Sequence, residues 1–256
     1  MVALFSRSVL RMTTWFTMLI CWALYSASFL FLVGRQTGPE PSLGLCTFQA
    51  GLVYGAPPLV SCASLIFVIE LYLRLTAVTL SRSVNERIVY WMPWTLPVVH
   101  STGFWVGILL GLSDVKTIER SSSGLYCRVN QNTPSTFAGA LVVLFAGSVV
   151  ILEVYIVIHL YHRRMFIKKI DARKMVDFPL KPFISMAAFT ILGGLAVIMV
   201  FVVEVSDEGS LLNILTVLPL AVGLIFGSQT DILVALMFWR KQQLELVKKP
   251  TSKSPV

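Results

Sequence analysis

Three carboxylate side chains lie inside long apolar runs of this 256-residue chain: Glu70, Glu153 and Asp231. An ionisable group at membrane depth is costly, so it usually faces the interior of a helix bundle and marks a functional site. Asp231 follows Ser228 and Gln229, which makes a polar cluster in an otherwise apolar segment. We expect a structural or switching role for this cluster, the alternative being a single residue solvated near the membrane surface.

Arg74 lies one helical turn beyond Glu70, and Tyr72 lies between them. Two interpretations of Glu70 are open. Its side chain either extends to the membrane surface, or it acts as a switch by pairing with Arg74 or with a basic residue of segment 162–182. The sequence names no partner for Glu153.

Four cysteines are present, and they fall into two pairs by position. Cys21 and Cys62 lie inside apolar runs, and we expect them to be small buried apolar side chains. Cys46 and Cys127 flank segments that the distribution of charge, given below, places outside the cytoplasm, where disulfides persist. We predict a disulfide between these two, the alternative being two unpaired thiols.

The composition is that of a membrane protein. Hydrophobic residues make up 56% of the chain and charged residues only 13%, with a mean hydropathy of +0.78, whereas soluble domains are about 25% charged. The net charge of +8 is concentrated in short segments between apolar runs. This distribution indicates membrane orientation and not a nucleic-acid-binding face.

Apolar runs long enough to cross a bilayer recur along the chain. We predict an all-α transmembrane bundle over residues 1–239 and a cytoplasmic tail over 240–256. The predicted spans are 14–33, 46–73, 88–112, 134–161, 183–203 and 211–239.

Lysine and arginine residues are distributed very unequally between the two sides of such a bundle. Seventeen fall on the side of residues 1–13, 74–87, 162–182 and the tail, and four on the other side. Basic segments stay in the cytoplasm, so we expect both termini to be cytoplasmic and the protein to reside in the plasma membrane.

Cys46 then begins the second span at its outer end, and Cys127 lies in the largest outer loop, between the third and fourth spans. This arrangement resembles that of G-protein-coupled receptors, in which such a pair of cysteines is bonded. The six spans resemble receptor helices two to seven, with the first helix lacking. A shortened gene sequence, a fragment and a true six-helix protein are all open as reasons.

Further motifs resemble those of the rhodopsin-like class only in part. In Glu70-Leu71-Tyr72, a leucine replaces the arginine of the acidic-Arg-Tyr triplet. Asp231 lies where an Asn/Asp-Pro-x-x-Tyr motif is expected, but the proline and the tyrosine are absent. The segment 226–233, Phe-Gly-Ser-Gln-Thr-Asp-Ile-Leu, more closely resembles divergent seven-helix receptor-like proteins of fungi.

A ligand pocket is expected between the outer halves of the helices. Its candidate lining residues are Gln49, Tyr54, His100, Thr102 and Trp105. For aromatic residues, contact with lipid is the alternative. Candidate residues for switching or for contact with a cytoplasmic partner are Glu70, Tyr72, Arg74, Lys168, Lys169, Arg173, Gln229 and Asp231. For the basic ones, contact with lipid headgroups is the alternative.

The resemblance implies a receptor that transduces an unknown extracellular signal to a heterotrimeric G protein. The alternatives are a small-solute transporter or channel, or a non-signalling truncated receptor partner. No catalytic motif and no phosphate-binding glycine loop appears, so we expect no enzyme activity and no cofactor. We expect no metal site either, because the other histidines, His159 and His162, are expected near the cytoplasmic face, well away from His100.

Overall fold

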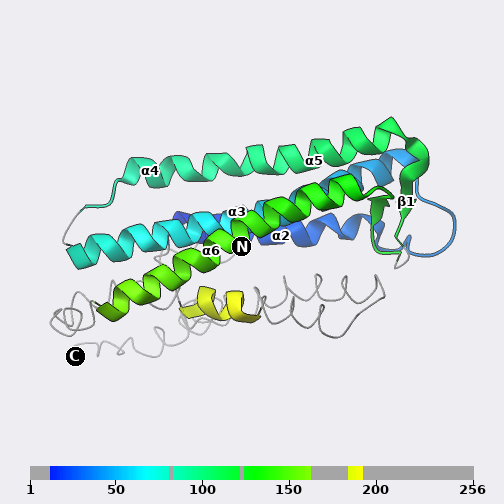
Figure 1. The fold of residues 1–256 in the computed structure, drawn as a ribbon. Coiled ribbons are helices and arrows are strands. Elements are labelled where there is room, and N and C mark those ends of the chain that lie inside the picture. The colour runs from blue at the N-terminus through cyan, green and yellow to red at the C-terminus, as the bar shows by residue number, and fades with distance from the viewer. Residues whose placement is uncertain (1–11, 81–82, 122–123, 163–183, 193–256) are drawn as a thin grey trace, which may run out of the picture.

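A computed structural model describes residues 12–80, 83–121, 124–162 and 184–192 of the chain. Long helices run side by side, and a short hairpin lies across one end of them (Figure 1). The elements in chain order are α2 (Thr13–Ser28), η1 (Leu30–Leu32), α3 (Leu43–Leu80), α4 (Glu86–Trp91), η2 (Met92–Trp94), α5 (Thr95–Ser113), η3 (Val115–Thr117), β1 (Ile118–Arg120), β2 (Cys127–Val129) and α6 (Asn132–His162). Residues 184–192 are also helical.

Four helical segments are long and apolar enough to cross a membrane: Thr13–Leu32, Leu43–Ala77, Glu86–Ser113 and Asn132–His162. They coincide with the first four predicted spans. Their outward faces are apolar as well; on α6, for example, Ile151 is 70% exposed. Outward apolar faces are what a lipid bilayer requires.

The last two predicted spans, 183–203 and 211–239, lie outside the described residues except for the helix at 184–192. The segment 240–256, predicted to be a cytoplasmic tail, lies outside them as well. So do Lys168, Lys169 and Arg173, together with Gln229 and Asp231.

Helix α3 is the central element, because α2, α5 and α6 each make most of their contacts with it. Its buried side chains, which include Phe67 and Leu71, join those of α2 and α6 in the main core cluster. Met186 and Phe189 of the helix at 184–192 join the same cluster. Each neighbouring helix is thus positioned through α3.

The helices differ from the prediction most clearly at the end of α3 and within the third span. The α3 helix continues seven residues past the predicted end at 73, to Leu80. No glycine or proline interrupts this stretch, and the hydroxyl of Thr76 donates to the Tyr72 carbonyl oxygen of its own helix (2.9 Å). The predicted span 88–112 is divided by the 3₁₀ turn η2, which contains Pro93. Proline has no N–H to continue an α-helical ladder.

Helices α3 and α5 approach closely at glycines. A Cβ atom added at Gly103 of α5 would lie 2.8 Å from the Cα of Gly55 on α3, and one at Gly107 would lie 2.9 Å from the Tyr54 ring. Small residues at such contacts let two backbones approach, which is how membrane helices gain packing energy without a hydrophobic driving force.

The segment between α5 and α6, predicted only as a loop, contains an antiparallel hairpin. Strands β1 and β2 pair in a register that sets Ile118 opposite Val129 and Arg120 opposite Cys127. The connection passes through Gly124, whose φ of 71° lies in the left-handed region that favours glycine. We call the end of the bundle with this hairpin the disulfide end, and the opposite end of α3 the Glu70 end.

Candidate functional site

A disulfide between Cys46 and Cys127 joins the first turn of α3 to strand β2, with the two Cα atoms 5.2 Å apart. The predicted pairing is therefore confirmed. Cys21 and Cys62 are free and buried, as expected. The disulfide lies in a small separate core at this end of the bundle, which also contains Leu32. The hairpin is thereby fixed to α3 both covalently and by packing.

Gln49 ties three elements together beside this disulfide. Its side chain is fully buried. The amide nitrogen donates to the Ser28 carbonyl oxygen at the end of α2 (3.1 Å), and the amide oxygen accepts from the Cys127 backbone N–H in β2 (3.1 Å). Because both ends of the amide are occupied by backbone groups, Gln49 has a structural role at this position.

Tyr54 and Arg120 add further bonds. The Tyr54 hydroxyl accepts from the Val129 N–H (3.1 Å) and donates to the Val129 carbonyl oxygen (3.3 Å). Arg120 of β1 donates to the carbonyl oxygens of Arg35 and Gly38 in the connection between η1 and α3 (3.1 Å each). The hairpin and this connection therefore form one cap over the disulfide end.

The remaining predicted ligand-binding residues lie along α5, and they do not gather with Gln49 and Tyr54. Thr102 is exposed, and its hydroxyl donates to the Val98 carbonyl oxygen of its own helix (2.8 Å). Trp105 is 54% exposed on the outward face. His100 alone among the five predicted residues lines the cavity described next.

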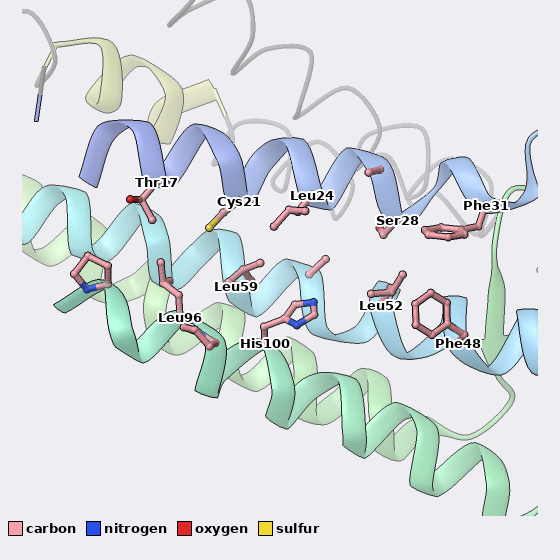
Figure 2. A pocket seen from close by; sticks show the side chains of 14 residues that line it. Thr17, Cys21, Leu24, Ser28, Phe31, Phe48, Leu52, Leu59, Leu96 and His100 are labelled. Atoms are coloured by element: carbon pink, nitrogen blue, oxygen red, sulfur yellow. The ribbon is translucent and has the colours of Figure 1, made fainter. Parts of the chain in front are cut away.

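An apolar cavity of about 560 Å³ lies between α2 and α5, with α3 as its floor (Figure 2). We call it the α2–α3–α5 groove. Its lining residues are Thr17, Cys21, Leu24, Ala27, Ser28, Phe31, Phe48, Leu52, Ala56, Leu59, Pro93, Leu96, Pro97 and His100. It follows α2 from its second turn to its end and continues to η1.

At the Glu70 end, the carboxylate of Glu70 is fully buried and bonded on both sides. The Thr14 hydroxyl of α2 donates to one oxygen. Arg74 donates to the other, with Nε and Nη2 each 2.6 Å away. Arg74 also lies 3.7 Å from Glu86 at the start of α4. The structure thus pairs Glu70 with Arg74 inside the bundle, away from the surface position that was the alternative.

Two more contacts bring α6 into the bundle. The rings of Tyr72 on α3 and Tyr155 on α6 meet edge to face, with centroids 5.6 Å apart. Glu153 is buried and accepts a hydrogen bond from the hydroxyl of Thr190 (3.0 Å). The partner of Glu153 thus comes from the helix at 184–192.

Sequence reasoning missed two sets of residues that hold these helices together. Thr14 is the first, and its hydroxyl had no distinguishing neighbour in the sequence. The glycines are the second. Gly51-x-x-x-Gly55 and Gly103-x-x-x-Gly107 both match the small-x-x-x-small pattern of close helix contacts in membranes. That spacing in two apolar segments predicts which faces of the helices meet.

Comparison with known proteins finds no match for this chain among family models, curated proteins or solved structures.

Proposed function

We propose that this chain is an integral membrane receptor of the G-protein-coupled class, similar to the divergent receptor-like proteins of fungi, and that it transduces an extracellular signal to a cytoplasmic G protein. One observation carries the proposal. A disulfide joins the first turn of the central helix α3 to the hairpin between α5 and α6. This is the connection by which the sequence resembles that class.

The Glu70 end supports the same proposal. A buried carboxylate there bonds to α2 through Thr14 and to Arg74 on α3, and Arg74 lies near Glu86 of α4. A salt bridge that joins several elements at one end of a bundle is a switch element when its loss favours a second arrangement. The unequal distribution of basic residues would place this end in the cytoplasm of the cell, with the disulfide end outside the plasma membrane.

The experiment measures nucleotide exchange on purified G proteins by the full chain in lipid nanodiscs. Because no ligand is specified, the variant Glu70→Gln replaces the stimulus by removing the charge that holds Arg74. We expect Glu70→Gln to raise the exchange rate several-fold above wild type on at least one class of Gα subunit. The matched control is Glu119→Gln, a carboxylate in β1 at the disulfide end that pairs with Arg128 (2.9 Å).

The control should exchange nucleotide at the wild-type rate. If folded wild type and Glu70→Gln leave exchange unchanged on every Gα class, the receptor proposal is wrong. Equal stimulation by both variants would show that Glu70 is not the switch.

A further inference from the structure

We propose that the α2–α3–α5 groove binds a neutral long-chain lipid, which enters from the bilayer and places a hydroxyl or carbonyl oxygen at His100. The inference names the class of ligand for the proposed receptor. The meaning of this binding for signalling rests on the proposed function. Binding itself is testable without any G protein.

The groove opens on the membrane-facing side of the bundle. Helices α2 and α5 each pack on α3 but make few contacts with each other. Leu24, in the groove, is 56% exposed, and Val98 on the outward face of α5 is 66% exposed. The lining is therefore continuous with the apolar faces that lipid covers. The cap held by the disulfide lies at the end of the bundle next to the groove, and the exposed side of the groove gives a lateral entry path.

The lining selects an apolar, uncharged molecule. None of the described residues that line the groove is acidic or basic, apart from the imidazole of His100. The hydroxyls of Thr17 and Ser28 are already bonded to backbone carbonyl oxygens of their own helix. A lipid with a charged headgroup would find no counter-charge here, and burying an unpaired charge is prohibitively costly.

Among the described lining residues, His100 supplies a ring nitrogen that is open to a polar contact. It is half-buried, and its ring stacks on Phe104 with centroids 6.1 Å apart. No described residue forms a hydrogen bond with its ring nitrogens. Fourteen residues separate it from Glu86 and thirteen from Ser113, so it lies about 20 Å from either end of this helical segment. A polar group so deep in apolar surroundings is stabilised by any oxygen that reaches it.

The dimensions favour a long molecule over a compact one. The lining of α2 and η1 runs from Thr17 to Phe31, which at the helical rise is about 21 Å. The volume of about 560 Å³ lies inside the range of roughly 300–1,000 Å³ for small-molecule sites. A long-chain molecule with one uncharged oxygen fits the elongated lining and the polar contact.

The test is photocrosslinking of the full chain in phosphatidylcholine nanodiscs. The probe is a long-chain fatty alcohol with a diazirine in the chain and a terminal alkyne. We expect saturable labelling of peptides from α2 and α5. An excess of the unlabelled alcohol should suppress the labelling at least five-fold more effectively than an alkane of the same length.

Two variants and a control make the result specific to the groove. Ala27→Phe fills the groove from α2 and should reduce labelling at least five-fold. Ala23→Phe introduces the same side chain at an exposed position on α2 outside the lining and should leave labelling unchanged. His100→Leu keeps an apolar side chain at this position and should abolish the preference for alcohol over alkane.

Three results would overturn the inference. Labelling would fail to saturate, it would spread evenly to the exposed face of α6, or it would be left unchanged by both Ala27→Phe and His100→Leu. Failure of binding would leave the receptor proposal standing on its nucleotide-exchange test. Failure of nucleotide exchange with intact binding would refute the receptor and keep the lipid site.

Discussion

Removing Arg74 should destabilise the protein more than removing the carboxylate that Arg74 binds. In Arg74→Leu the fully buried Glu70 carboxylate keeps, among the described residues, only the Thr14 hydroxyl as a partner. In Glu70→Gln the charge that must be compensated is itself gone. The guanidinium left behind in that variant is 34% exposed and has access to water and to Glu86.

The magnitudes follow from this asymmetry. Breaking a buried ion pair by removing one partner costs about 3–5 kcal/mol, and because Arg74 is partly exposed we take the lower value, about 3 kcal/mol, for Arg74→Leu. In Glu70→Gln the charge-assisted hydrogen bonds are lost, but the new amide and the Arg74 guanidinium both keep other partners. The expected cost is about 1–2 kcal/mol. Loss of the bond between α2 and α3 in Thr14→Val should cost roughly 0.6–1.7 kcal/mol, as for other hydrogen bonds between membrane helices.

The assay is thermal unfolding of the purified full chain in detergent. At about 2–4 °C per kcal/mol for a domain of this size, Arg74→Leu should lower the apparent Tm by about 6–12 °C. Glu70→Gln should lower it by about 2–8 °C. The double variant Glu70→Gln/Arg74→Leu should lie close to Glu70→Gln alone, because no orphaned charge remains.

Arg87→Leu is the matched control, because Arg87 is exposed and its side chain bonds to no described residue. It should shift the Tm by less than 2 °C, as exposed substitutions generally do. If Arg74→Leu is as mild as Arg87→Leu, or if the double variant is as unstable as the sum of its parts, the buried pair does not hold this end of the bundle.

Three further outcomes follow from the packing and the cap. Gly103→Ala should destabilise the protein by about 1–3 kcal/mol because the added Cβ would meet the backbone of α3. Gly147→Ala should not, because a Cβ at that position has nothing within 4 Å. Unfolding of both variants in detergent compares them. Reduction of Cys46–Cys127, which closes a separation of 81 residues, should cost about 4 kcal/mol and expose two thiols to a maleimide reagent. Gln49→Leu leaves two buried backbone groups unpaired and should cost about 2–4 kcal/mol, measured as faster cleavage of the hairpin by protease.

The sequence predicted the first four membrane-spanning helices well because their signal is long and local. Twenty or more apolar residues between charged segments have few alternatives to a membrane-spanning helix. The ends were less certain, as the continuation of α3 to Leu80 shows. That continuation depends on packing that hydropathy does not register, as the burial of Leu75 shows. The hairpin was missed because each strand has only three residues, too few for alternation to be visible.

The candidate site was predicted in part, and the reason is geometric. The cysteine pair and the pairing of Glu70 with Arg74 depend on residue types at recognisable positions. Which residues line a cavity depends on the rotation of each helix about its axis. Gln49 and Tyr54 were sensible ligand contacts by type and depth, yet both point to the hairpin and are bonded there. His100 points into the groove, and the sequence had no means to separate these three residues.

Helix α3 reaches the cap, the groove and the buried ion pair, so it offers a direct route for coupling between these sites. Pro57 and Pro58 lie near its middle, where two missing N–H donors leave the helix weakest against bending. Ala56 and Leu59, on either side of the prolines, are in the floor of the groove. An occupant of the groove therefore contacts α3 at the turn where the least energy changes its direction. The bond from Glu70 to Thr14 of α2 depends on that direction, which is the physical route by which the proposed lipid would act on the proposed switch.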